Sequence, residues 1–397
     1  MDKYFLIKVL IGLCIGIVSA VGLLGTMYSF RRKRFYISLP LIIWGMLVNV
    51  TFVLLYVKNI YDDYVSDQID LKNASSLYYY MNIICSLANY VSQVIQTKAI
   101  MNFYNSVPLF ETIRFLDITA KAVRSSGILV FVKVILFPII IEINLLVREM
   151  HTGPDFNIWQ TFYALYPTVL ANFLPNCIFS GFVICRETMI ALGGHLRLIE
   201  KEANFYQDVR QMTLHKPFYR MQIFCDLSDK VDVLAGHYTS ICYYTTAFMQ
   251  LGAMPILFSL LSNLFGITAG FFQQYYAIAD TMINEESYNL FDAMTNGVFL
   301  VISFSEIALL SMVANECIEK IRETSLILKR IRLNNCDIRF RQSVDRFSLQ
   351  IFVQQFKIQP MGLLEINISL MHDVLSAVTS FLLILIQSDL TLRFSLK

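Results

Sequence analysis

The sequence has few charged residues, and its cysteines and histidines follow no metal-binding pattern. Charged residues make up 16% of the 397 residues, against about 25% in soluble globular proteins. The eight cysteines and five histidines match no zinc or redox spacing. We therefore expect free thiols, no disulfide framework, no metal and no cofactor. The net charge is only +2, which gives no reason to expect a nucleic-acid partner.

Long apolar runs are present instead. Hydrophobic residues make up 56% of the chain and the mean hydropathy is +0.55. A helix of about 20 apolar residues, at a rise of 1.5 Å per residue, matches the ~30 Å hydrocarbon core of a bilayer. We therefore predict an all-α integral membrane protein. Seven spans are predicted, over residues 35–56, 77–100, 127–147, 159–185, 238–272, 290–314 and 366–386.

The charged segments between these spans predict long cytosolic helical extensions. The expected organisation is an apolar N-terminal helix (1–30), spans one to four (31–185), a cytosolic helical anchor (186–237), spans five and six (238–314), cytosolic anchor helices (315–359), and span seven with a short extracellular tail (360–397).

The apolar run Phe5–Met27 leaves three alternatives open, namely a cleaved signal peptide, a true span, or a re-entrant or interfacial helix. Cleavage is disfavoured, because the basic stretch 31–34 and a new span follow at once. Hydropathy does not decide whether the run crosses.

Basic residues are strongly biased to one side of the predicted membrane. The segments 31–34, 98–126, 186–237 and 314–346 hold 23 Lys and Arg, and the segments on the opposite side hold 5. The positive-inside rule then places the N-terminus in the cytosol and the C-terminus outside. G-protein-coupled receptors have the reverse orientation, and the chain lacks their Asp-Arg-Tyr and Asn-Pro-x-x-Tyr motifs. On this topology Asn73, in Asn73-Ala74-Ser75, is a predicted glycosylation acceptor.

The last span combines apolar and polar residues, so one of its sides must face protein or water. Helical spacing places Ser380, Leu383, Ile384 and Gln387 on one face, which suits either a pore lining or a helix–helix seam. The run Ser380-Phe381, five hydrophobic residues and Gln387-Ser388 resembles the signature of the insect gustatory receptor family, which is related to the insect odorant receptors. That signature is Thr-Tyr, five hydrophobic residues and Gln-Phe. Phe347-Ser348-Leu349-Gln350, Gln354 and Pro360-Met361-Gly362-Leu363 also resemble the family's approach to its last helix.

The resemblance implies a tetrameric, ligand-gated, non-selective cation channel without enzymatic chemistry. It implies four identical or related subunits, a small tastant as ligand, and the plasma membrane of chemosensory neurons as location. It also implies that the last helix lines the pore, with Leu383, Ile384, Gln387 and Ser388 near its narrowest point. An apolar ring can gate by dewetting, and a ring of amides can coordinate partly hydrated cations. Ser388 replaces the closing phenylalanine of the signature, which puts the tightness of closure in question.

Aromatic and amide side chains near the outer ends of the spans are candidates for the ligand pocket. The selected residues are Tyr79, Trp159, Tyr163, Tyr166, Gln273, Tyr276 and Asp292. Each tyrosine also suits an interfacial aromatic belt that contacts membrane lipid. The nature of the tastant, sugar or bitter, stays open.

Lys133, Glu142 and Glu306 lie within predicted spans, where each needs a partner or an aqueous cavity. Both alternatives stay open. A second functional class is a secondary transporter, although the paired inverted repeats typical of that class are not found.

Overall fold

The computed structural model describes residues 5–29, 31–32, 34–65, 74–106, 109–152, 158–283, 288–354 and 356–395. The predicted all-α architecture is confirmed, with one short β-hairpin in addition. In chain order the elements are α1 (Phe5–Ala20), β1 (Thr26–Ser29), β2 (Arg34–Ile37), α2 (Leu39–Val65), α3 (Ala74–Ser106), α4 (Leu109–Phe115), α5 (Ala120–Phe131), the π-helical turn η1 (Val132–Leu136), α6 (Phe137–Thr152), α7 (Ile158–Tyr206), α8 (Val209–Leu214), α9 (Pro217–Leu251), α10 (Ala253–Ile283), α11 (Leu290–Arg330), α12 (Ile338–Gln354), the 3-10 turn η2 (Pro360–Gly362) and α13 (Ser369–Ser395). The candidate glycosylation residue Asn73 lies outside the described residues.

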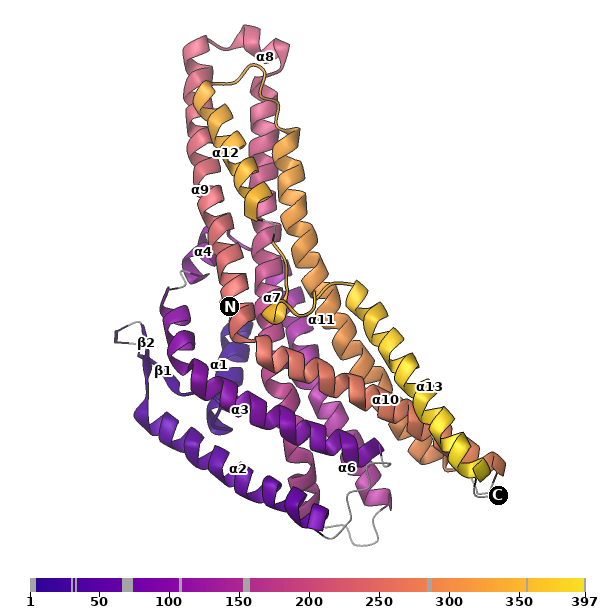
Figure 1. Cartoon of the computed structure of the whole chain (residues 1–397). Coiled ribbons are helices and arrows are strands. Elements are labelled where there is room, and N and C mark those ends of the chain that lie inside the picture. The colour runs from indigo at the N-terminus through magenta and orange to yellow at the C-terminus, as the bar shows by residue number, and fades with distance from the viewer. Residues whose placement is uncertain are drawn as a thin grey trace.

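The helices form a bundle with a long rod extending from one end (Figure 1). The rod contains the later part of α7, the first part of α9, the later part of α11, and α12, with α8 at its tip. Aromatic rings pack inside the rod. The ring centres of Phe224 (α9) and Phe340 (α12) are 5.5 Å apart, and those of Tyr238 (α9) and Phe347 (α12) are 5.4 Å apart. The hydroxyls of Ser228 and Ser343 share a hydrogen bond of 2.8 Å beside them.

The rod corresponds to the predicted anchor segments 186–237 and 315–359. These segments do not form separate domains, because α7 and α11 continue without interruption from the bundle into the rod.

Six helices among the described residues are long and apolar enough to cross a membrane. They cover Leu39–Asp62, Ala120–Arg148, Thr161–Tyr206, Ala253–Ile283, Leu290–Arg330 and Ser369–Phe394. The sequence predicted a seventh span over 77–100, and this segment lies in α3. It is not among the six because its polar residues lower its mean hydropathy.

The polar residues of α3 bond to neighbouring helices. Asn82 donates to Thr168 Oγ1 of α7 (3.3 Å) and accepts from Ser262 Oγ of α10 (2.6 Å). The Ser86 hydroxyl donates to the carbonyl of Pro167 (2.9 Å). These polar groups of α3 face protein and not lipid. A helix buried in this way can therefore carry more polar residues than a lipid-facing helix.

Two prolines within α7 each leave one backbone carbonyl without its helical donor. Pro167 frees the carbonyl of Tyr163, which accepts from Tyr56 OH of α2 (2.7 Å). Pro175 frees the carbonyl of Ala171. Asn89 Nδ2 of α3 lies 3.5 Å from that oxygen and donates to the neighbouring carbonyl of Leu170 (3.1 Å). The prolines are therefore tolerated because α2 and α3 supply donors.

The predicted span over 238–272 is two helices that meet at Gly252. This residue ends α9, and its N–H donates to the carbonyl of Phe248 (3.0 Å). A β-carbon at Gly252 would lie only 2.7 Å from Cδ1 of Ile178. The absence of a side chain therefore lets the corner pack closely against α7.

The N-terminal region differs from the expectation that a span begins at residue 35. Residues 34–37 form β2 instead, paired antiparallel with β1, and α2 begins at Leu39. The carbonyl of Ala20, at the end of α1, accepts from Trp44 Nε1 (3.0 Å), which lies on the second turn of α2. Gly22, with φ of +77°, then turns the chain back toward the hairpin.

Candidate functional site

Only one face of α13 is covered within the single chain. Leu370, Val374 and Val378 are buried, and α13 runs along α10 (Figure 1). The spacing of four residues between them defines one helical face. Ile386 and Arg393 continue the same side and are half-buried. The final helix therefore rests against its own subunit through a single stripe.

The opposite face of α13 is exposed and partly polar. Leu383 is 55% exposed and Ile384 61%, and Ser380, Gln387 and Ser388 are exposed as well. The hydroxyl of Ser380 donates to the carbonyl of Ser376 (2.9 Å), so it is satisfied within the helix, while the amide of Gln387 projects from it. All four residues predicted to line a pore thus lie on the uncovered face.

The C-terminal end of α13 is tied to α10 by an ionic cluster. Arg393 Nη1 lies 2.7 Å from Asp280 Oδ1, and its Nε lies 2.7 Å from Asp389 Oδ2. Tyr275 OH donates to Asp389 (3.1 Å), and the guanidinium lies 4.7 Å from the ring centre of Tyr276. The segment after 387, predicted as a short extracellular tail, is helical in the structure, because α13 continues to Ser395. The Asp389–Arg393 spacing of four residues was the available signal for the longer helix.

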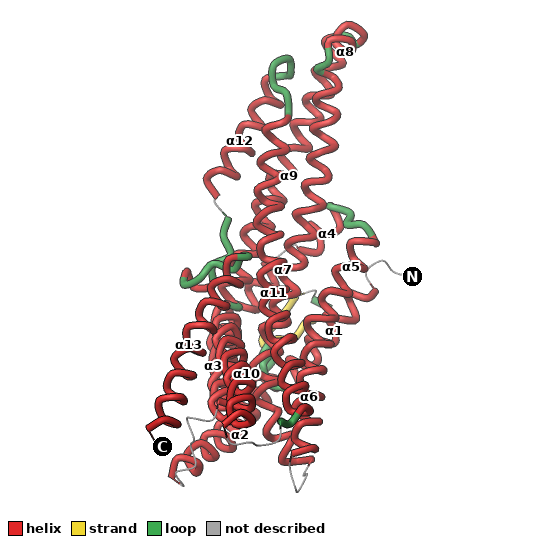
Figure 2. Tube along the Cα trace, turned by 90° about the vertical axis from the view of Figure 1, so that its right-hand side faces the viewer, coloured by secondary structure: helices red, strands yellow, loops and turns green. Residues whose placement is uncertain are grey.

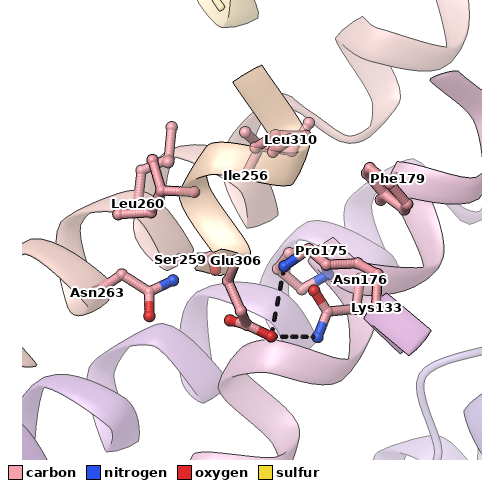
Figure 3. Close-up of a pocket in the computed structure, with 11 residues that line it drawn as sticks. Lys133, Pro175, Asn176, Phe179, Ile256, Ser259, Leu260, Asn263, Glu306 and Leu310 are labelled. Atoms are coloured by element: carbon pink, nitrogen blue, oxygen red, sulfur yellow. Dashed lines mark hydrogen bonds and ion pairs between the residues drawn. The ribbon is translucent and has the colours of Figure 1, made fainter. Parts of the chain in front are cut away.

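A second polar site lies deep between helices. Lys133 Nζ of η1 lies 3.3 Å from Glu306 Oε1 of α11, and Asn176 Nδ2 of α7 donates to the same oxygen (3.3 Å). Figure 3 shows the lysine and the asparagine converging on this carboxylate. Lys133, Asn176 and Glu306 are 5%, 3% and 2% exposed. The question left open by the sequence is thus resolved, since Lys133 pairs across helices with Glu306 and not with Glu142.

Irregular backbone accompanies this site. Lys133 lies in the π-helical turn η1, and Asn176 follows Pro175. A cavity of about 20 Å³ lies beside the three polar groups, and Ser259 and Asn263 of α10 also line it. That volume holds about one water molecule. The site can therefore hydrate the ion pair but is too small for an organic ligand.

Two of the predicted ligand residues lie together between α2 and α7. Tyr163 stacks on Tyr56 with ring centres 4.5 Å apart and planes within 5°, and its hydroxyl donates to the carbonyl of Leu55 (3.1 Å). The ring centre of Tyr166 lies 6.2 Å from that of Phe52 of α2. Sequence reasoning missed Phe52 and Tyr56, whose spacing of four residues was their only signal.

The other five predicted ligand residues lie elsewhere. Tyr79, on α3, is half-buried and packs against the same core, and Trp159 is 78% exposed near the start of α7. Gln273 and Tyr276 lie on α10, where Tyr276 contacts Arg393. Asp292 accepts from Asn289 Nδ2 (2.8 Å) at the start of α11. The seven residues are therefore distributed over several helices and form no single pocket among the described residues.

Comparison with known proteins identifies the family. A model of the 7tm chemosensory receptor family matches residues 9–392. The chain belongs to this family. It is a multi-pass membrane receptor of the chemosensory type, and not an enzyme.

Two proteins of Drosophila melanogaster show the relationship at high coverage. The receptor is 37% identical to putative gustatory receptor 94a, over 99% of this chain and 97% of that protein. It is 40% identical to putative gustatory receptor 97a, over 93% and 88%. The predicted resemblance to the insect gustatory receptors is thus confirmed.

The fold is shared with solved structures of an insect olfactory receptor. One is olfactory receptor OR5 from Machilis hrabei in complex with eugenol, at 13% identity, and the other is OR5 from the same species, at 12% identity. Each has a TM-score of 0.59. The match covers 98% of this receptor and 100% of each solved chain. At this identity the likeness shows the arrangement of helices.

Proposed function

We propose that this receptor is a ligand-gated, non-selective cation channel in the plasma membrane of chemosensory neurons. Four identical or related copies surround one pore, and a small organic tastant opens it. The observation that carries the proposal is the uncovered face of α13, where Gln387 and Ser388 follow an apolar level formed by Leu383 and Ile384. A lipid-facing helix would not place an amide and several hydroxyls on its exposed side, whereas a pore would use them.

Exposed apolar side chains near the base of the rod support an assembly of several copies. Phe352 and Val353 of α12 are 74% and 72% exposed, and Leu363, after η2, is 74% exposed. These residues lie directly before α13 in the chain. Large apolar side chains that are exposed in neighbouring segments form a candidate protein interface. We place the contacts between subunits here, beside the pore.

Cysteine accessibility during voltage-clamp recording tests the pore. Single replacements Ile384→Cys and Gln387→Cys should allow a charged thiol reagent to change the ligand-evoked current. Val378→Cys is the matched control, because Val378 is 2% exposed and is buried within its own subunit. Equal modification at 378 and 387, or no current with related subunits under a broad tastant panel, would contradict the channel proposal. Substrate uptake without conductance would favour the transporter class.

The ligand is proposed to bind in the outer half of the bundle, near Tyr163 and Tyr166. Tyr166→Phe keeps the ring and removes only the hydroxyl, so a shift in the tastant concentration–response curve would indicate direct contact. Tyr163→Phe is the comparison, because that hydroxyl already bonds to Leu55. Trp159, Tyr79, Gln273, Tyr276 and Asp292 stay predictions to be tested in the same assay.

The proposed orientation places the N-terminus in the cytosol and the end of α13 outside. Glycosidase treatment should shift the mobility of the wild-type receptor but not of Asn73→Gln. An antibody to an N-terminal tag should bind only after permeabilisation. A tag detected on intact cells would overturn the orientation.

A further inference from the structure

The β-hairpin formed by β1 and β2 lies at a membrane boundary. The apolar helix α1 precedes it, and the membrane-crossing part of α2 begins at Leu39, two residues after β2 ends. Figure 2 shows the two strands, in yellow, among the helices of the bundle below the rod. Only one residue therefore separates the hairpin from the start of a candidate membrane span.

The hairpin is held rigidly against α3. Asn105, near the end of α3, accepts from the backbone N–H of Phe35 (2.7 Å) and donates to the carbonyl of the same residue (2.8 Å). The ring of Phe35 stacks on the ring of Tyr104 of α3, with ring centres 5.0 Å apart. The ring of Tyr28 is tilted against that of Phe35, also with ring centres 5.0 Å apart. One amide side chain thus fixes the edge of β2.

The strand register separates two faces of the hairpin. Cross-strand pairs share a face, so Tyr28 and Phe35 lie on the side that contacts α3. The pair Met27–Tyr36 and the residue Arg34 lie on the other side. Met27 is 50% exposed and Tyr36 43%, and Tyr36 OH lies 3.4 Å from Met27 Sδ. The outward face therefore combines an apolar side chain, an amphipathic ring and a cation.

Two further arginines, Arg31 and Arg32, lie in the turn between the strands. Arg31, Arg32 and Arg34 are exposed, and none pairs with an acidic side chain among the residues that the structure describes. Like charges this close repel one another and need counter-charges. An aromatic ring at headgroup depth beside clustered arginines is the composition that favours anionic lipid.

We propose that this hairpin surface, formed by Met27, Arg31, Arg32, Arg34 and Tyr36, binds the headgroups of anionic phospholipids. The side chains of the arginines contact phosphate and carboxylate oxygens, and Tyr36 and Met27 enter the interface. The assignment to the cytosolic leaflet rests on the proposed orientation. The binding itself does not, because both faces of the receptor are accessible in detergent.

The test uses the purified full-length receptor in a neutral detergent, with phosphatidylserine or phosphatidylcholine added. Thermal unfolding is followed by size-exclusion chromatography of the heated samples, since a ligand that binds only the folded state raises the melting temperature. Phosphatidylserine should stabilise the wild type more than phosphatidylcholine does. The triple variant Arg31→Gln, Arg32→Gln, Arg34→Gln should weaken the apparent affinity for phosphatidylserine on the order of a hundredfold.

The matched control removes the same charge from the rod. Lys329→Gln, Arg330→Gln, Arg332→Gln changes three exposed basic residues at the end of α11, and it should respond to phosphatidylserine like the wild type. Equal losses in both variants would show an effect of net charge alone and overturn the proposal. An equal response of the wild type to both lipids would also overturn it.

A second measurement covers the case in which the triple variant does not fold. Raising the salt concentration from about 0.15 M to about 1 M shortens the Debye length from about 8 Å to about 3 Å. The extra stabilisation of the wild type by phosphatidylserine should then disappear. Its persistence would contradict headgroup binding by the arginines. Neither result bears on whether α13 lines a channel, which the cysteine experiment tests separately.

Discussion

Lys133 Nζ lies 3.3 Å from Glu306 Oε1 inside the bundle, and both side chains are almost fully buried. Asn176 supplies one further donor to the carboxylate. Together, Lys133, Glu306 and Asn176 join η1, α11 and α7. At this level α7 carries Pro175, and η1 is itself a π-helical turn. Breaking such a pair from one side leaves a buried charge without compensation.

We therefore predict that Lys133→Met and Glu306→Gln each reduce stability by about 3–5 kcal/mol. The double replacement Lys133→Met, Glu306→Gln should recover much of the loss, because neither charge is then left in the bundle. Melting temperature and surface expression measure the effect. A double variant as unstable as the sum of the singles would mean that the two residues act independently.

The carbonyl freed by Pro175 gives a second prediction. Asn89→Leu removes the amide near Leu170 and Ala171, which leaves buried acceptors without that donor. The expected loss of stability is about 1–3 kcal/mol. Ser92→Ala is the matched control on the same helix, because the buried Ser92 hydroxyl has no hydrogen-bond partner among the described residues. This change should cost much less. Equal melting temperatures for Asn89→Leu and the wild type would contradict the assigned role.

Hydropathy and charge bias predicted the fold class, and the spacing in α13 predicted which residues its exposed face carries. Both depend on local sequence. The corner at Gly252 depends on Ile178, and the helix beyond Gln387 is held by Asp280, which comes more than 100 positions earlier. Such long-range contacts leave little signal in a single sequence.

The ligand residues show the same limit. Helical spacing alone places Trp159, Tyr163 and Tyr166 on one face of a helix, but the rotation of that helix is set by its neighbours. Tyr163 therefore stacks on Tyr56 of α2, whereas Trp159 stays exposed. The hairpin was missed because its four-residue strands follow an apolar helix directly, and hydropathy does not separate a short strand from the start of a span.

His237 gives a pH-dependent prediction. Its ring stacks on Phe115 with centres 4.3 Å apart, and its Nδ1 lies 3.3 Å from Thr112 Oγ1. Burial lowers the pKa of His237 below its ordinary value of about 6.5. The folded state then binds fewer protons than the unfolded state in this range. Stability from this residue is complete above about pH 6.5 and is lost as the pH falls toward the lowered pKa.

The measurement is the melting temperature of the receptor between about pH 7.5 and pH 5. The wild type should become less stable as the pH falls, and His237→Gln should remove part of that slope because glutamine does not titrate. Both proteins should respond alike above about pH 7. If the two slopes coincide over the whole range, His237 does not contribute to the pH dependence.

The ionic cluster at the end of α13 gives the last prediction. Arg393 joins Asp280 of α10 to Asp389 of its own helix. The side chains of Arg393 and Asp280 are only 16% and 15% exposed. Arg393→Gln leaves two carboxylates close together, so it should destabilise the receptor more than Asp280→Asn, which leaves Arg393 paired with Asp389. The exchange Asp280→Arg, Arg393→Asp should stay as unstable as Arg393→Gln, because it places two aspartates four residues apart on α13. Adding Asp389→Asn to the exchange should then restore stability, since it removes that repulsion. Melting temperatures of the four variants measure this order. Failure of the added Asp389→Asn to improve the exchanged receptor would show that the cluster does not fasten the C-terminal end of α13.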